Sequence, residues 1–289
     1  MKEALIYKKL SGKRVQCGVC NHFCKISDGS RGVCGVRENK GGKLFALNFG
    51  KSIAVSLDPI EKKPLYHFLP GTFTYSFATV GCNFRCDWCQ NWEISQGHKP
   101  AGNIPGEEIS PGEHVASAIK NECPSISYTY TEPTMFIEYA LSTMKLAKKK
   151  GLKNIWVSNG YMSDESLKLI LPYLDAINVD LKSYKDKTYQ KFCGAKLEPI
   201  LKNIEMIYKH KVYLEITTLI IPGLNDSQKE LTQIAEFIAK KLSPETPWHI
   251  SRFFPAWKMT GEITPRKTLE LARKIGHKVG LKYIHIGNI

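Results

Sequence analysis

The sequence predicts an α/β fold built from repeated βα units, a full or partial TIM-type barrel, with a small four-cysteine module at its amino-terminal end. From about residue 74 onward, strand-like apolar runs alternate with helix-like amphipathic runs, a pattern typical of a parallel sheet. Polar residues follow most of the strand-like runs, as expected where the carboxyl ends of parallel strands carry a site. A chain of 289 residues with 43% hydrophobic content is long enough to bury a full core.

The chain divides into three predicted segments. Residues 1–50 are rich in Cys, Gly and Lys, with a turn at 39–42 between two short apolar stretches. Residues 51–73 contain several prolines, which favour extended backbone, so we expect a connector. Residues 74–289 are expected to form the barrel.

The barrel segment contains six or seven βα units. Strands are predicted at residues 74–80, 125–130, 154–158, 176–181, 212–221, 248–254 and 283–286. Helices are predicted at residues 134–149, 164–171, 199–209, 227–241 and 264–279. Helix-length amphipathic runs between short β-branched runs are what a (β/α) barrel requires.

Composition narrows the function classes. A net charge of +14 is compatible with binding to an acidic partner such as a nucleic acid. The lysines are dispersed along the chain, however, as at 148–150 and 240–241, which is typical of solvated helix faces. We therefore do not expect nucleic-acid binding. The sequence has no apolar run of about 18 residues and its first residues lack a signal-peptide pattern, so we expect a cytoplasmic protein that does not enter membranes.

Seven of the nine cysteines fall in two tight clusters, which indicates metal ligation rather than disulfides in a chain of this size. The other two, Cys123 and Cys193, receive no predicted role, because buried thiols often act as small apolar side chains.

Cys82, Cys86 and Cys89 form the more informative cluster. Three closely spaced thiolates can hold a four-iron cluster and leave one iron free for a small molecule, whereas structural sites normally take four protein ligands. Trp88, directly before the last cysteine, could shield such a cluster from water. The sequence spacing alone leaves two alternatives: a zinc site completed by a distant residue, or coincidence.

The amino-terminal cluster is Cys17-x2-Cys20-x3-Cys24-x9-Cys34. Four thiolates are the usual ligand set of a closed structural site, so we expect either zinc or an auxiliary iron–sulfur cluster there. His22 lies within the cluster and could replace one thiolate. A module this poor in apolar residues is expected to need its metal in order to fold.

The spacing Cys-x3-Cys-x2-Cys with an aromatic residue before the third cysteine resembles the signature of the radical S-adenosylmethionine (SAM) superfamily. Residues 58–96, the segment 130–133 and the amino-terminal module resemble the AmmeMemoRadiSam group, relatives of the pyruvate formate-lyase activating enzymes. The resemblance implies a [4Fe–4S] cluster on Cys82, Cys86 and Cys89 that cleaves SAM reductively. The resulting 5′-deoxyadenosyl radical would abstract a hydrogen atom, with a protein as the first expected substrate.

The resemblance also implies partners and SAM contacts. An electron donor such as a ferredoxin or flavodoxin is expected, and Memo-like and AMMECR-like proteins are expected as partners or pathway neighbours. The implied SAM contacts follow successive strands: Thr131 and Glu132 after the second, Ser158 and Asn159 at the third, Asp180 and Lys182 at the fourth, Thr217 on the fifth, His249 and Arg252 on the sixth.

Several of these residues also have a purely structural interpretation. Glu132 and Pro133 could simply begin a helix, since a carboxylate is favourable there. Asn159 with the following glycine could form an ordinary turn. His249 could belong to the core, because it stands near the start of its strand.

Two other functions fit part of the sequence. One keeps radical chemistry but modifies RNA; it is weaker because no compact RNA-binding signature is present. The other is a non-enzymatic scaffold with zinc at both cysteine clusters.

Overall fold

The computed structural model describes residues 1–289, except the side chains of Pro100 and Ala101. The chain forms two compact units. Unit 1 consists of Met1–Phe84 and Asn91–Ile177, and unit 2 consists of Arg85–Gln90 and Asn178–Ile289.

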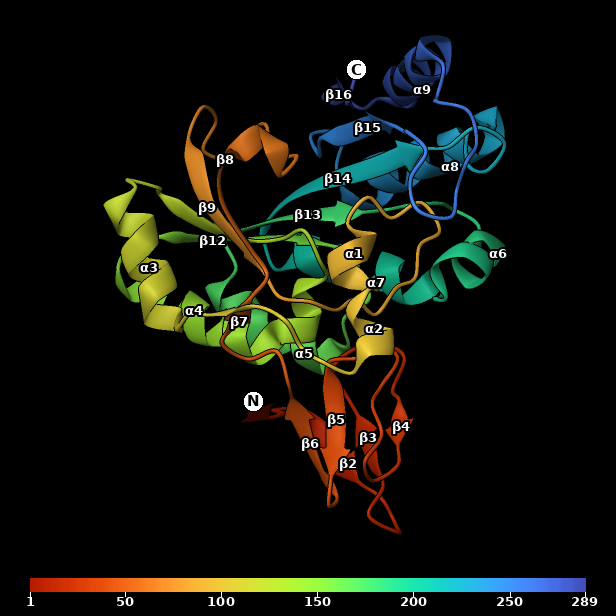
Figure 1. Cartoon of the computed structure of the whole chain (residues 1–289). Coiled ribbons are helices and arrows are strands. Elements are labelled where there is room, and N and C mark those ends of the chain that lie inside the picture. Colours follow the sequence, from red (N-terminus) through yellow and green to blue (C-terminus); the bar gives the residue numbers. More distant parts are fainter. The chain divides into compact units, whose positions relative to one another are not determined.

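The first part of unit 1 is a module of two small antiparallel sheets (red to orange in Figure 1). One sheet has the order β1 (Lys2–Glu3), β6 (Lys43–Ala46), β5 (Arg37–Lys40). The other has the order β2 (Tyr7–Lys9), β3 (Val15–Cys17), β4 (Lys25–Ile26). Val15 and Leu44 are fully buried. They belong to a small aliphatic core together with Ala4, Ile6, Val19, Ile26, Val36, Ala46 and Leu47. Such a core by itself gives the module modest stability.

The rest of unit 1 is a βα assembly. Its strands lie in the order β8 (Ala54–Pro59), β9 (Phe73–Ala78), β11 (Ser125–Tyr128), β12 (Lys153–Ser158). Strands β9, β11 and β12 are parallel, and β8 pairs antiparallel with β9. Helices α3 (Pro111–Lys120), α4 (Ile137–Lys149) and α5 (Asp164–Ile170) belong to this part (Figure 1). Short elements complete it: η1 (Ile60–Lys62), β7 (Lys51–Ser52), β10 (Glu107–Glu108), α1 (Trp92–Ser95), α2 (His98–Ala101), η2 (Pro133–Phe136) and η3 (Leu171–Tyr173).

Unit 2 repeats the βα pattern. Strands β14 (Tyr213–Ile220), β15 (Trp248–Arg252) and β16 (Ile284–Gly287) are parallel, and β13 (Ala176–Asp180) runs from the end of unit 1 into unit 2. The helical segments are α6 (Asp186–Thr188), the π-helix η4 (Tyr189–Cys193), α7 (Glu198–Lys209), α8 (Gln228–Phe237), the π-helix η5 (Ile238–Leu242) and α9 (Arg266–Val279).

Local sequence explains where several helices begin and end. Ser110 and Glu113 form a reciprocal capping box at the start of α3, and the Ser227 side chain accepts the Glu230 N–H at the start of α8. Gly280 ends α9 in the left-handed region with φ +106°.

The predicted α/β fold with an amino-terminal cysteine module is confirmed, and every predicted strand is present with ends shifted by a few residues. Among the described residues, β8 in unit 1 and β16 in unit 2 each pair with one neighbouring strand, and the TIM-type barrel stays a prediction. Strand β8 lies inside the segment expected to be a connector. The three domain boundaries stay a prediction. In the part of the chain that the structure describes, no helix has the length and apolarity needed to cross a bilayer.

A buried ion pair fastens the amino-terminal module to α4. The Arg37 guanidinium on β5 donates to both carboxylate oxygens of Glu138, at 2.9 and 2.6 Å. Both side chains are 1% exposed, and Glu138 also accepts the Leu5 N–H at 3.0 Å. Burial alone would raise the pKa of Glu138, but Arg37 lowers it below its usual value. The carboxylate therefore stays ionised inside the protein.

We expect Glu138→Gln to destabilise the protein by about 3–5 kcal/mol, because it leaves the Arg37 charge buried and unpaired. Urea unfolding followed by circular dichroism measures this. In the wild type, the pKa of Glu138 is lower in the folded than in the unfolded protein. Its ionised form should therefore contribute fully to the free energy of unfolding at pH values above the ordinary glutamate pKa. That contribution should be lost as the pH falls through the lower pKa of the folded protein.

The matched control is Glu236→Gln, because Glu236 pairs with Lys240 on the surface, where the side chains are 42% and 66% exposed. It should change the unfolding free energy by less than about 1 kcal/mol. Equal effects of the two substitutions would contradict the role given to the buried pair.

Candidate functional site

In unit 1 the predicted site residues gather at the carboxyl ends of three parallel strands. Cys82 follows β9, Glu132 follows β11, and Ser158 ends β12 with Asn159 directly after it. Because β9 and β12 both pair in parallel with β11, these ends lie along one edge of the sheet.

The Glu132 carboxylate joins the ends of β11 and β12. Its Oε1 accepts the Ser158 hydroxyl at 2.9 Å and both the backbone N–H and the hydroxyl of Thr134, at 3.1 and 2.5 Å. Its Oε2 accepts the Asn159 N–H at 2.8 Å. Glu132 is 3% exposed; burial raises its pKa, while these hydrogen bonds oppose that rise. Glu132 thus caps the η2 helix, as the plainer interpretation expected, and also orders the next strand end.

Asn159 extends this network to the first cysteine of the triplet. Its Nδ2 donates to Asn83 Oδ1 at 2.8 Å and lies 4.0 Å from Cys82 Sγ. The Phe84 N–H donates to the same sulfur at 3.3 Å. A turn is also present, because Asn159 Oδ1 accepts the Tyr161 N–H. One continuous set of hydrogen bonds therefore runs from Glu132 to the Cys82 sulfur.

The backbone near Cys82 is tightly packed. Gly81 has φ +109°, and a Cβ atom there would lie 2.7 Å from Val36 of the amino-terminal module. Glycine is therefore required at this position by both conformation and space. The Thr131 hydroxyl donates to the Thr79 carbonyl at 2.8 Å, so Thr131 also braces the end of β9.

A second buried cluster in unit 1 involves Asp58, Lys63 and Tyr130. The Lys63 ammonium donates to Asp58 at 2.7 Å and lies 4.4 Å from the centre of the Tyr130 ring, while the Tyr130 hydroxyl donates to the same carboxylate. Burial alone would raise the pKa of Asp58, but the bonds from Lys63 and Tyr130 lower it. Tyr130, held at φ +62°, has its pKa raised to about 12 by burial and the Asp58 bond. This cluster was not predicted.

Unit 2 holds Cys86 and Cys89. The Arg85 and Asp87 N–H groups donate to the Cys193 and Phe192 carbonyls on the π-helix η4, and Cys89 N–H donates to the Cys86 carbonyl. The buried Cys193 thiol also forms a side-chain hydrogen bond with Cys86. That bond and burial raise the pKa of the Cys86 thiol, while Lys182 opposes the rise. Cys193, which was given no role, is thus a direct neighbour of the triplet.

The predicted pair Asp180 and Lys182 is present at the end of β13. The Lys182 ammonium donates to Asp180 Oδ2 at 2.8 Å. Burial alone would lower the pKa of Lys182, but Asp180, Cys86 and Cys193 raise it well above its usual value. The Tyr189 hydroxyl accepts the Lys182 N–H at 2.9 Å. Lys182 therefore places a positive charge near the Cys86 sulfur.

The remaining predicted residues of unit 2 have varied surroundings. Trp88 is 4% exposed and lies 6.2 Å from the Phe192 ring, which fits a shielding role. The Thr217 hydroxyl is buried and has no hydrogen-bond partner among the described residues. His249 Nε2 pairs with Glu215 at 2.5 Å inside the unit. The Arg252 Nε donates to the Thr264 carbonyl at 2.9 Å. His249 and Arg252 therefore brace strands and loops of the unit.

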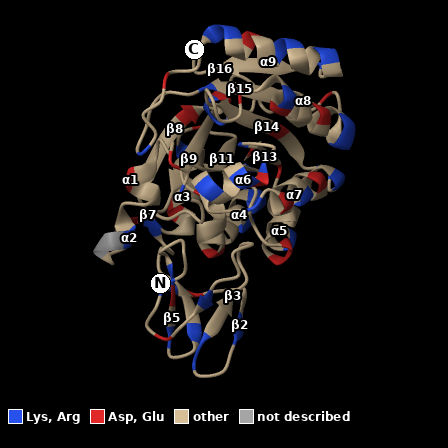
Figure 2. Ribbon diagram, turned by 90° about the vertical axis from the view of Figure 1, so that its right-hand side faces the viewer, with Lys and Arg blue, Asp and Glu red and all other residues tan. Residues whose placement is uncertain are grey.

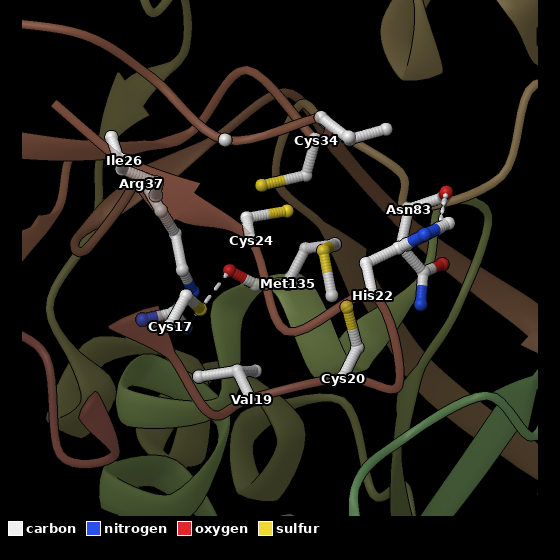
Figure 3. A pocket seen from close by; sticks show the side chains of 12 residues that line it. Cys17, Val19, Cys20, His22, Cys24, Ile26, Cys34, Arg37, Asn83 and Met135 are labelled. Atoms are coloured by element: carbon white, nitrogen blue, oxygen red, sulfur yellow. Dashed lines mark hydrogen bonds between the residues drawn. The ribbon is translucent and has the colours of Figure 1, made fainter. Parts of the chain in front are cut away.

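The four amino-terminal cysteines line one cavity of unit 1, and Figure 3 shows their side chains around it. Its other lining residues are Val19, His22, Ile26, Gly32, Val33, Arg37, Asn83 and Met135. Burial raises the pKa of the Cys17 thiol to about 11 and raises those of Cys20 and Cys24. The backbone groups of Val19, His22 and Val33 hydrogen-bond these three thiols.

No group of three or more His, Cys, Asp or Glu side chains in the described part of the chain is arranged to hold one metal ion. The roles of individual residues as cluster ligands and SAM contacts stay predictions. The metal or cluster bound by the amino-terminal cysteines also stays a prediction.

We expect Glu132→Gln to destabilise the protein by about 1–3 kcal/mol, because the amide NH2 group would face N–H donors from Thr134 or Asn159. Urea unfolding measures this. The control Glu108→Gln changes an exposed side chain and should stay within about 0.5 kcal/mol of the wild type. A Glu132→Gln protein as stable as this control would show that the network does not hold the strand ends.

Comparison with known proteins identifies the family. The model of the radical SAM superfamily matches residues 77–238. An uncharacterized protein of Methanocaldococcus jannaschii is 46% identical over 290 residues, covering 100% of this chain and 86% of that protein. The (2S)-3-sulfopropanediol sulfolyase activating enzyme of Bilophila wadsworthia is 32% identical over 106 residues, which cover 36% of this chain and 35% of that enzyme.

A solved structure shares the fold. A domain of pyruvate-formate lyase-activating enzyme from Bacteroides vulgatus superposes with a TM-score of 0.51 at 22% identity, covering 57% of this chain and 99% of that domain. With the cysteine triplet at the end of the first parallel strand and the family match across more than half of its length, this chain belongs to the radical SAM superfamily.

Proposed function

We propose that the protein is a radical SAM enzyme whose Cys82, Cys86 and Cys89 hold a [4Fe–4S] cluster, and whose substrate is a protein. The observation that carries this proposal is the hydrogen-bonded network of unit 1, which connects Cys82 to Glu132, Ser158 and Asn159 at the ends of three parallel strands. With the cluster bound, SAM would supply a 5′-deoxyadenosyl radical that abstracts a hydrogen atom from the substrate.

Two features of the protein stabilise negative charge at the triplet sulfurs, against the burial that raises the pKa of the Cys86 thiol. In unit 1, the Phe84 N–H donates to the Cys82 sulfur and the Asn159 amide lies near it. In unit 2, the positive charge of Lys182 opposes the rise in the pKa of Cys86. Hydrogen-bond donors and a cation near sulfur stabilise the negative charge that ligation requires.

Glu132 has capacity left for a cationic ligand. Its Oε1 accepts three hydrogen bonds, but Oε2 accepts one, from the Asn159 N–H. Oε2 carries two lone pairs and meets a single donor, so its second lone pair suits the ammonium of SAM. The network would hold Glu132 in place and limit its rotation while it binds.

Unit 2 supplies a surface for a substrate. A hollow at the carboxyl ends of β14 and β15 is lined mainly by apolar residues, including Phe192, Pro222, Phe253 and Met259. Phe192 is the neighbour of Trp88, beside Cys89. An apolar hollow suits a hydrophobic side chain of a protein substrate better than a polar metabolite.

The substrate class rests on likeness to the activating enzyme of Bilophila wadsworthia, which by its name acts on another enzyme. RNA is disfavoured because acidic residues are interspersed with basic ones along α7 and α8 (Figure 2), although α9 carries five Lys or Arg residues and one Glu. Dispersed positive charges form a weaker binding surface for a phosphate backbone than a continuous basic patch does. Membership of the AmmeMemoRadiSam group, and Memo-like, AMMECR-like and ferredoxin or flavodoxin partners, are part of this proposal.

The test is anaerobic incubation of the iron-loaded protein with SAM and a strong reductant, followed by quantitation of 5′-deoxyadenosine and methionine. We expect both products from the wild type. Cys86→Ala should reduce them to the level of a protein-free control, because it removes a proposed cluster ligand.

The matched control is Cys123→Ala, which changes another buried cysteine, on the loop before β11. It should keep iron content and product formation close to the wild type. Equal product from the Cys86→Ala and wild-type proteins, or none from well-loaded wild type, would refute the proposal.

A further inference from the structure

The four-cysteine cavity of the amino-terminal module has the properties of a binding site that is already formed by the fold. Its thiols come from β3, the loop between β3 and β4, and the loop before β5, so three chain segments converge on one space (Figure 3). The rest of the wall is mostly apolar, with Val19, Ile26 and Met135. A dry, sulfur-lined cavity is suited to a group that binds soft ligands.

Two buried N–H donors of the cavity wall lack partners among the described residues. The Arg37 Nε and the Asn83 Nδ2 are both buried without a hydrogen bond, although each side chain is only 1% exposed. Leaving such a donor unpaired in the protein interior is energetically unfavourable. Both residues line the cavity, and a bound group with thiolate or inorganic sulfide acceptors would supply the partners that these donors lack.

The arrangement of the cysteines distinguishes between the two candidate groups. Zinc bonds thiolates at about 2.3 Å, so its four sulfurs crowd around one point. The described residues contain no group of three or more such ligands arranged to hold a single ion. An iron–sulfur cluster instead lies between its cysteines and keeps them apart. We therefore infer that the amino-terminal cysteines Cys17, Cys20, Cys24 and Cys34 bind an auxiliary iron–sulfur cluster, not zinc.

This cavity adjoins the loop of the first triplet cysteine. Asn83, which follows Cys82 in sequence, forms part of the cavity wall, and its carbonyl is 2.8 Å from His22 Nε2. Helix α2 also connects the two loops, because His98 bonds the Cys34 carbonyl and Lys99 donates to the Cys82 carbonyl. The auxiliary cluster would therefore be a near neighbour of a cluster held through Cys82.

The experiment uses the full chain with the triplet removed, as Cys82→Ala/Cys86→Ala/Cys89→Ala. This variant keeps the amino-terminal cysteines, so its metal content does not depend on the proposed SAM chemistry. It is reconstituted anaerobically with iron and sulfide in the presence of equimolar zinc, desalted, and analysed for iron, sulfide and zinc. We expect about two or four irons with an equal amount of sulfide per chain, and little zinc.

The matched control adds Cys20→Ala to the triplet variant and should lose that iron. Electron paramagnetic resonance of the reduced wild type should show two clusters in magnetic interaction, and the triplet variant should show a single, non-interacting signal. One zinc per chain without iron, or no metal in a triplet variant that is folded by circular dichroism, would overturn the inference. These outcomes leave the proposed SAM cleavage to be judged separately by its own products.

Discussion

The buried Glu132 carboxylate is the constraint on which the arrangement of unit 1 depends. A carboxylate that is 3% exposed is costly unless its oxygens are hydrogen-bonded, and here four donors from the chain satisfy it. Two of those donors belong to Ser158 and Asn159, at the end of the next strand. The need of the buried Glu132 carboxylate for hydrogen-bond donors therefore sets the positions of two strand ends. Through Asn159 it also sets the position of the loop that carries Cys82.

The amino-terminal module is fastened to this same region. Cys20 forms a β-bridge with Met162, and the Asn21 side chain donates to the Met162 carbonyl at 2.6 Å, three residues after Asn159. The Arg37–Glu138 pair attaches the module to α4 from another side. A module with so small an apolar core gains its order from these attachments and from whatever its thiols bind. Its state should consequently influence the loops that carry Cys82 and Asn159.

Sequence patterns predicted the parts of the structure that depend on local order along the chain. The alternation of strand and helix patterns predicted the βα units, and the spacing of Cys82, Cys86 and Cys89 predicted the family. The pairing of Asn83 with Asn159 and of Cys193 with Cys86 was not predictable, because those partners are 76 and 107 positions apart (159 − 83 and 193 − 86). An asparagine or cysteine without periodic neighbours gives no sequence signal of such a contact.

The cluster formed by Asp58, Lys63 and Tyr130 escaped prediction for a related reason. The prolines of residues 51–73 predicted an extended connector, yet strand β8 and helix η1 lie in this segment, where Asp58 and Lys63 are 3% and 2% exposed. Tertiary pairing with β9 outweighed the local composition. The residues that a motif can reveal are therefore those next to one another in sequence, while the residues that hold them in place come from the fold.

The proposed function requires that Cys82, Cys86 and Cys89 hold a cluster with one iron open to SAM. Electron–nuclear double resonance on the reduced protein with SAM labelled with ¹⁵N in the amino group and ¹⁷O in the carboxylate tests it most directly. We expect hyperfine coupling of both labels to the cluster in the wild type, and its loss in Cys86→Ala. A reduced cluster that shows no coupling to either label would contradict the proposed function.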